Sequence, residues 1–131
     1  MKEFSWQARV YYEDTDAGGV VYHARYVAFY ERARTEMLRY SGISQDNLLK
    51  ENIAFVVKQM TIDYVSAARL DDLLTIESSI AQVRNASLTF NQTICDQNQR
   101  LISRATVLIA CVNTTKMKPI ALPKNMMMEF M

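Results

Sequence analysis

The sequence predicts an α+β fold in which one five-stranded antiparallel sheet wraps around a single long central helix. One stretch, residues 24–40, repeats apolar side chains at helical spacing, whereas most of the remaining chain alternates or is β-branched. A helix that must bury one stripe and a sheet that must bury one face pack most economically against each other. With 131 residues, the chain is expected to form a single domain over residues 1–131.

The first expected strand leads into a polar loop. Its apolar residues alternate, which predicts that they share one face: Phe4, Trp6, Ala8, Val10 and Tyr12. The loop that follows, residues 13–19, has short polar side chains and then Gly18 and Gly19, which can take positive φ.

The helix is expected over residues 24–40. Its apolar stripe consists of Tyr26, Phe29, Tyr30, Ala33, Met37 and Tyr40. Ser41 and Gly42 are a plausible end for this helix, and Ser44 is a suitable N-cap for a short helix through about Lys50.

Strand patterns fill the rest of the chain. They cover residues 54–65, 74–80, 88–94 and 101–112, and short polar turns join the last three into an antiparallel meander. Such a sheet keeps open edges, which invite pairing between protomers. We therefore expect a symmetric homodimer with a continuous sheet, or a homotetramer.

Composition excludes several classes of protein. The net charge of +1, without a run of like charges, argues against nucleic-acid binding. No apolar stretch approaches the length of a membrane span, and the first residues contain no apolar secretory segment. Only Cys95 and Cys111 are present, inside strand patterns, so a disulfide framework is not expected. We expect a cytoplasmic protein.

The loop and helix start carry a specific motif, YYEDTDAGGVVYHARY, from Tyr11 to Tyr26. This segment resembles the signature of the 4-hydroxybenzoyl-CoA thioesterase family, and most closely its YbgC-like branch, found beside bacterial Tol-Pal envelope genes. The resemblance continues through residues 29–36, 67–72 and 116–119 and so covers nearly the whole chain. It implies the hotdog fold, in agreement with the element order.

The resemblance also implies site residues. The family's catalytic aspartate falls on Asp16, and the histidine typical of the YbgC-like branch falls on His23. A backbone N–H that holds the thioester carbonyl falls near His23, and a second segment falls near residues 54–57. Some relatives have a glycine in that segment where this chain has Ala54.

Thioester hydrolysis requires a nucleophile and a polarised carbonyl, and one short segment of this chain offers both. Asp16 can activate water or attack the thioester directly, and the residues leave this choice open. Unpaired N–H groups at the helix start can stabilise the oxyanion, and glycines at 18 and 19 permit close approach. The expected substrate-binding residues are Tyr12, Gly18, Gly19, Val20, Tyr22, Phe55, Val56, Val57 and Lys58.

Other interpretations remain for several residues. His23 can act in catalysis or simply hydrogen-bond the loop. Asp14 is expected to cap the loop rather than bind a metal, since further ligands are lacking. Glu31 is expected to form an ion pair with Arg34 or a neighbouring arginine. Both cysteines are expected to be buried and unreactive. No metal or cofactor is expected, and the candidates for the phosphates of coenzyme A are Lys58, Arg84, Arg104, Lys116 and Lys118.

Three functions follow from these features. The first is hydrolysis of acyl-CoA, or of acyl groups on an acyl-carrier protein. The second is a hydratase or dehydratase of the same fold acting on acyl thioesters, although the histidine and proline motifs of those enzymes are not evident. The third is a non-catalytic scaffold that binds acyl-carrier protein.

Overall fold

The structure, a computed structural model, describes residues 3–130. Residues 1, 2 and 131 of the expected single domain lie outside the described residues. The elements, in chain order, are β1 (Glu3–Arg9), a 3₁₀ turn (Tyr12–Asp14), α1 (Arg25–Tyr40), α2 (Gln45–Lys50), β2 (Ile53–Tyr64), β3 (Leu73–Val83), β4 (Ser87–Cys95), β5 (Leu101–Asn113), β6 (Lys118–Pro119) and α3 (Lys124–Phe130).

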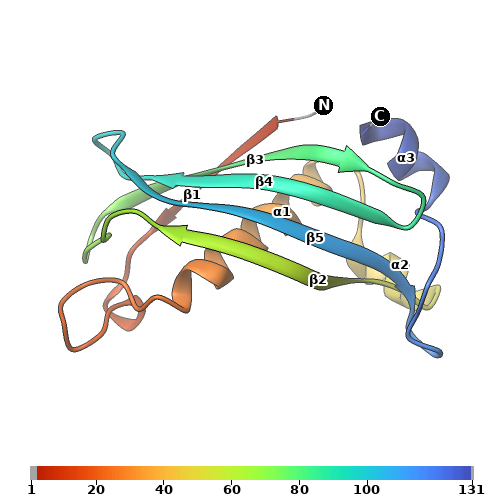
Figure 1. The fold of residues 1–131 in the computed structure, drawn as a ribbon, viewed down its shortest axis with the longest axis horizontal. Helices are drawn as coiled ribbons and strands as arrows, with labels where there is room; N and C mark the ends of the chain where they lie inside the picture. Colours follow the sequence, from red (N-terminus) through yellow and green to blue (C-terminus); the bar gives the residue numbers. More distant parts are fainter. Residues whose placement is uncertain (1–2, 131) are drawn as a thin grey trace.

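The sheet is antiparallel throughout, in the order β1-β3-β4-β5-β2 (Figure 1). The predicted meander of three consecutive strands is confirmed as β3–β4–β5. The two-residue β6 also pairs with the end of β5, a small addition to the five expected strands. β1 and β2 form the two edges, because each pairs with a single neighbour.

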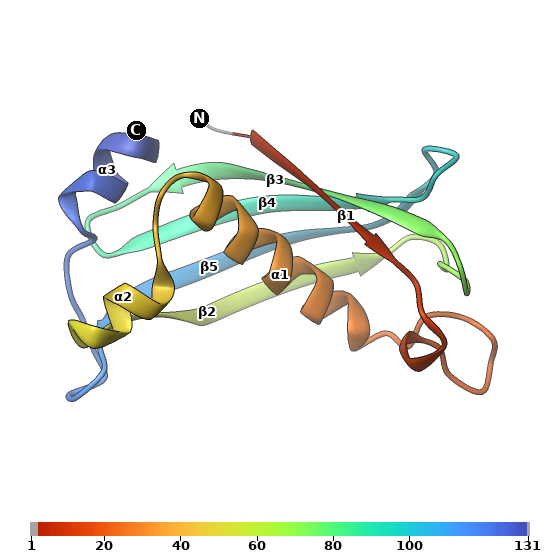
Figure 2. The ribbon, with the colours of Figure 1, turned by 180° about the vertical axis from the view of Figure 1, so that it is seen from behind.

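The long helix lies across one face of the sheet, as Figure 2 shows from behind. Its buried residues include Tyr26, Phe29, Tyr30, Ala33 and Met37, which confirms that part of the predicted stripe. The prediction is wrong for the last residue of the stripe. Tyr40 is 79% exposed, because the helix stops there. Its ring lies beside that of Phe4 in β1.

The first strand is shorter than its apolar alternation predicts. β1 ends at Arg9, Val10 is buried, and Tyr12 begins the 3₁₀ turn with 81% of its surface exposed. The Tyr11 N–H donates to the Asp14 carboxylate at 2.8 Å and turns the chain away from the strand direction. Tyr12 therefore does not share the buried face.

The core lies between the helix and the concave face of the sheet. Phe90, Ile94, Ile76 and Leu74 of the central strands are fully buried there. The predicted N-cap of the short second helix is confirmed, since the Ser44 hydroxyl accepts from the Asn47 N–H. Among residues 3–130, no helix has both the length and the apolarity required to cross a bilayer.

Candidate active site

The loop between β1 and α1 is closed at its neck by backbone contacts. Thr15 and Val21 form an isolated bridge, and inside it the Asp16 N–H donates to the Val20 carbonyl at 2.9 Å. The Gly19 N–H returns to the Asp16 carbonyl at 3.0 Å, and Gly19 itself has a φ of +79°. A residue with a β-carbon is strained at such a φ, which explains the need for glycine at this position.

The Asp16 carboxylate lies exposed on this loop. Its Oδ1 accepts the Gly18 N–H at 2.8 Å, a contact that fixes the side chain against its own backbone. A β-carbon on Gly18 would meet this oxygen at 3.1 Å, so the absence of a side chain leaves room for the carboxylate. No hydrogen bond in the described part of the chain uses Oδ2, which remains available to an incoming molecule.

Asp14 has the opposite character. It is 5% exposed, its Oδ2 accepts the Tyr11 N–H, and its Oδ1 lies 3.1 Å from Nε of Arg25 in the first turn of α1. Its backbone carbonyl also accepts the Tyr22 N–H at 2.9 Å. Asp14 therefore anchors the loop to the helix start, as expected for a loop-capping acid.

Two backbone N–H groups immediately before α1 have no acceptor among the described residues. The Tyr22 and Arg25 N–H groups donate to backbone carbonyls, whereas those of His23 and Ala24 find no partner among residues 3–130. Both residues are exposed. Unpaired N–H groups at a helix start carry partial positive charge and favour an anionic oxygen.

The His23 ring lies among tyrosines rather than against a carboxylate. Its centroid is 4.6 Å from that of Tyr22 and 6.2 Å from that of Tyr64, at the end of β2. The Tyr64 hydroxyl donates to the His23 carbonyl at 3.2 Å. No hydrogen bond or ion pair within the described chain joins the imidazole to Asp16. Tyr64, which fixes the peptide at the helix start, escaped sequence reasoning because its partner lies 41 positions away.

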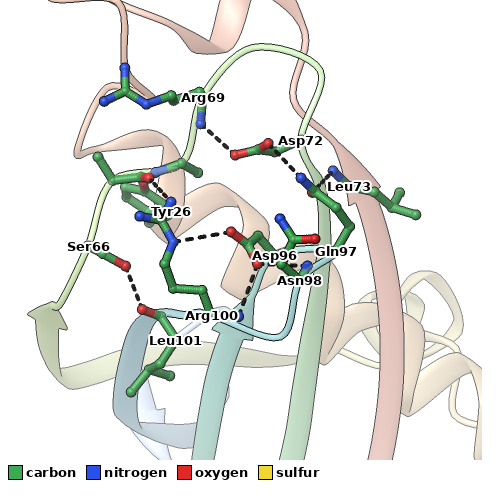
Figure 3. Close-up of polar contacts among 12 residues, drawn as sticks. Tyr26, Ser66, Arg69, Asp72, Leu73, Asp96, Gln97, Asn98, Arg100 and Leu101 are labelled. Atoms are coloured by element: carbon green, nitrogen blue, oxygen red, sulfur yellow. Dashed lines mark hydrogen bonds and ion pairs between the residues drawn. The ribbon is translucent and has the colours of Figure 1, made fainter.

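A second loop, residues 65–72, supports the Asp16 loop from below. The Tyr26 hydroxyl accepts the Ala68 N–H at 3.1 Å, and the Ala68 carbonyl accepts the Val21 N–H at 2.9 Å. Figure 3 shows Arg100 and Asp96 on the connection between β4 and β5, from which Nη2 of Arg100 donates to the Ala67 carbonyl at 2.8 Å. The Ala68 backbone therefore contacts both the first turn of α1 and the end of the Asp16 loop. The sequence marked Tyr26 as a member of the apolar stripe and as the end of the motif, and neither predicts its contact with Ala68.

The remaining predicted binding residues divide into two groups. Tyr12, Gly18, Gly19, Val20 and Tyr22 all belong to the Asp16 loop or its flanks. Residues 55–58 lie near the beginning of β2, beside α2, whereas the end of β2 approaches the Asp16 loop (Figure 2). Tyr64 lies nine positions after Phe55, which corresponds to roughly 30 Å along a strand. One protomer does not bring the two groups together.

Several alternative site residues are less suitable. Burial raises the pKa of the Cys95 and Cys111 thiols, which opposes formation of a nucleophilic thiolate. Arg104, a candidate for coenzyme A phosphates, is already paired with Asp63 at 3.4 Å. The predicted ion pair between Glu31 and an arginine does not occur among residues 3–130.

Comparison with known proteins finds relatives along nearly the whole chain. The family model of the thioesterase-like superfamily matches residues 10–130. The acyl-CoA thioester hydrolase YbgC of Escherichia coli O6:H1 is 58% identical over 127 residues, which cover 97% of this chain and 95% of that protein.

Solved structures give the same assignment. A probable thioesterase from Bartonella henselae, 39% identical, superposes with a TM-score of 0.86 over 93% of this chain and 100% of that one. A 1,4-dihydroxy-2-naphthoyl-CoA thioesterase from Synechocystis, 23% identical, has a TM-score of 0.93 over 98% of this chain and 96% of that one, and shows the hotdog fold. By sequence along nearly its whole length and by fold, the chain belongs to the thioesterase-like superfamily, as a YbgC-type member.

Proposed function

We propose that this chain hydrolyses acyl-CoA thioesters at the Asp16 loop, with Asp16 as base or nucleophile and helix-start N–H groups as oxyanion donors. One observation carries the proposal: a single short segment holds an exposed carboxylate with a spare oxygen and two N–H groups without acceptors. A relative named as an acyl-CoA thioester hydrolase matches 97% of the chain, which supports the same substrate class.

The N–H groups of His23 and Ala24 suit the negative charge that develops on the thioester oxygen. Backbone donors fixed by a helix need no rearrangement during the reaction, and each such donor contributes about 3 kcal/mol to transition-state stabilisation in acyl transfer. Gly18 and Gly19 add no side chains to the approach, so the pantetheine arm of the substrate can lie close to the loop.

Asp16 can act by two routes. As a general base it removes a proton from water, which then attacks the carbonyl carbon; as a nucleophile it forms an acyl anhydride that water opens. Turnover in water labelled with heavy oxygen detects an anhydride that water opens at the aspartyl carbonyl. Label that enters the Asp16 carboxylate requires the anhydride, whereas label confined to the acid product over repeated turnovers favours water activation.

His23 is assigned a supporting role. Its imidazole is exposed and unpaired among the described residues, so it can donate a proton to the departing sulfur or orient water. Replacement of His23 by Asn should lower kcat less than replacement of Asp16, because a thiolate is already a good leaving group.

A second protomer would bring the two separated groups of binding residues together. β2 is an edge strand, and its Val57 and Tyr64 are 50% and 51% exposed although they pair with the buried Ile109 and Ser103 of β5. Antiparallel pairing of two β2 strands about a two-fold axis sets the beginning of one beside the end of the other. Phe55, Val56, Val57 and Lys58 of one protomer would then lie beside the Asp16 loop of its partner.

The substrate can also arrive on another carrier. Coenzyme A and acyl-carrier protein present the same pantetheine arm, so the Asp16 loop suits either thioester, and acyl-carrier protein is the expected protein partner. Both carriers are found in the cytoplasm, where we place this protein. Thiol release from purified acyl-carrier protein loaded with the same acyl group tests the partner directly.

The deciding experiment measures thiol release from acyl-CoA thioesters of several chain lengths. We expect the native chain to be active and Asp16→Ala and Asp16→Asn to lose about 10²- to 10⁴-fold in kcat, the usual contribution of a positioned base. Asp46→Asn, on the surface of α2, is the matched control and should keep native activity. Full activity in both Asp16 variants would exclude the assigned role.

A further inference from the structure

Arg34 is buried inside the molecule without an acidic partner. Within α1, all of which the structure describes, it is the one charged residue below the surface, at 6% exposure. Its Nη1 donates to Oε1 of Gln92 on β4 at 3.1 Å, and no ion pair of Arg34 occurs among residues 3–130. A buried guanidinium without a carboxylate is costly unless something compensates its charge.

The partner amide is itself held in place. Nε2 of Gln92 donates to the Tyr30 carbonyl at 3.0 Å and to the Ser78 hydroxyl at 2.8 Å, so Oε1 must face Arg34. Gln92 is 1% exposed and Ser78 is 2% exposed, so this network cannot readily rearrange. Arg34 is therefore fixed by one nitrogen while its remaining donors are unused.

Arg34 also borders a cavity. No fully buried side-chain nitrogen or oxygen among the described residues lacks a hydrogen bond, so Nε and Nη2 of Arg34, which have none, must be open to solvent. Arg34 lines a pocket of about 320 Å³ between α1 and the beginning of β2. The pocket is the path by which solvent, or a ligand, reaches these nitrogens.

The rest of the pocket has an apolar side and a polar side. Phe55, Val57 and Ile109 are among the residues that contribute hydrocarbon. Thr35 and Gln45, hydrogen-bonded to each other, are polar, and Glu31 is the one carboxylate of the lining. Such walls suit a short hydrocarbon chain whose end carries an oxygen acceptor for the guanidinium. The planar fork of arginine matches a carboxylate in two parallel hydrogen bonds.

We propose that this pocket receives the distal end of the acyl group and that Arg34 selects acyl-CoA thioesters whose acyl chain ends in a carboxylate. The inference rests on the proposed thioesterase function and on β2 pairing, which sets the partner's Asp16 loop beside Phe55 and Val57. The reacting carbonyl then lies near that loop, and the acyl chain extends along β2 toward Arg34.

Glu31 should have the opposite effect to Arg34 on the choice of acyl group. Its exposed carboxylate lines the same pocket and acts on the Arg34 charge from a distance. Glu31 would therefore repel a ligand carboxylate while Arg34 attracts it. Removal of the Glu31 charge should strengthen the preference for dicarboxylic acyl groups, whereas removal of the Arg34 charge should abolish it.

The test compares acyl groups of equal length that differ only at the far end. Thiol release is measured with succinyl-, glutaryl- and adipoyl-CoA against butyryl-, valeryl- and hexanoyl-CoA, and the ratio of kcat/KM within each pair is the readout. We expect at least one pair to favour the carboxylate in the native protein. Arg34→Met should lower that ratio about 10- to 100-fold, the usual range for a charge-assisted hydrogen bond.

Three matched variants separate recognition from folding. Arg34→Lys keeps the charge and should restore part of the ratio, Glu31→Gln should raise it, and Glu36→Gln, on the same helix outside this pocket, should leave it unchanged. Glu31→Gln remains informative if the buried Arg34 variants fold poorly, because Glu31 is exposed. A native ratio below one for every pair, or a ratio that no variant moves, would overturn the proposal.

Binding measurements distinguish this inference from the proposed function. Carboxyalkyl-CoA and alkyl-CoA thioethers cannot be hydrolysed, and calorimetry measures their affinities whether or not the protein is active. A preference for the carboxyalkyl thioether that disappears in Arg34→Met supports the pocket even without hydrolysis. Equal affinities, together with ordinary thiol release from butyryl-CoA, would leave the thioesterase intact and remove the selectivity.

Discussion

At the scale of single residues, two aspartates in the same loop have different environments. The Asp14 carboxylate is buried, accepts the Tyr11 N–H and pairs with Arg25, whereas the Asp16 carboxylate is exposed and, among residues 3–130, accepts only the Gly18 N–H. The spacing of the two acids alone does not separate these roles. The separation comes from the 3₁₀ turn, which points the first carboxylate inward.

This difference predicts opposite effects of the same chemical change. Asp14→Asn should lower the free energy of unfolding by about 1–3 kcal/mol, because a buried charge-assisted contact with Arg25 is lost. Asp16→Asn should change it by less than about 0.5 kcal/mol while activity disappears. Urea unfolding and thiol release measured on both variants check this. Equal loss of stability in the two variants would contradict the distinction.

At the scale of elements, the turn between β4 and β5 helps to support the Asp16 loop. Oδ1 of Asp96 accepts the N–H groups of Asn98 and Arg100, and Oδ2 accepts Nε of Arg100 (Figure 3). Arg100 in turn donates to the Ala67 carbonyl in the loop of residues 65–72. One carboxylate therefore connects a hairpin turn to the loop beneath the helix start.

The same contacts predict a pH dependence of stability. The backbone N–H of Arg100, then that of Asn98 and the Arg100 side chain, lower the pKa of Asp96 below its ordinary 3.8. The ionised Asp96 carboxylate contributes fully to folding stability at pH values above its ordinary pKa. This contribution is lost as the pH falls through the lower pKa of the folded state, because the unfolded chain binds the proton more readily than the folded chain does. Asp96→Asn should remove this part of the acid sensitivity.

Urea midpoints at neutral and acidic pH measure that effect. The native protein should lose more stability on acidification than Asp96→Asn does. The control is Asp46→Asn, whose side chain is 81% exposed in the native protein. If Asp96→Asn and the native protein lose the same stability in acid, the turn does not depend on the ionised carboxylate.

At the scale of the whole molecule, pairing of two chains would complete the proposed site. The beginning of β2 and the Asp16 loop lie at opposite ends of one protomer, roughly 30 Å apart along the strand. Pairing of the two β2 edges would join Asp16 of one chain with Val57 of the other. Each dimer would then contain two such sites.

Mixed dimers test this arrangement. Asp16→Asn and Val57→Asp should each be inactive alone, since each alters both sites of its own dimer. Co-expressed with different affinity tags and purified as the mixed species, they should contain one intact site of two and recover about half of native activity. A mixed dimer no more active than its parents would show that both residues act within one chain.

The sequence by itself determined the order of elements, the buried stripe from Tyr26 to Met37 and the position of the loop that carries Asp16. These features follow from local patterns: alternation, helical spacing, glycines and a motif within a few residues of chain. The same local reasoning misplaced Tyr12 and Tyr40, because each lies where its element ends. The contact between Tyr11 and Asp14 turns the chain at Tyr12, and α1 ends at Tyr40.

Only the tertiary structure decided which distant residues meet. Tyr64 lies against His23, Ala68 bridges Tyr26 and Val21, and Arg34 lines a pocket between α1 and β2. These contacts join residues dozens of positions apart, through the register of strands and the angle of the helix. No local pattern encodes them, because a pairwise contact between elements depends on how the whole sheet curves around α1.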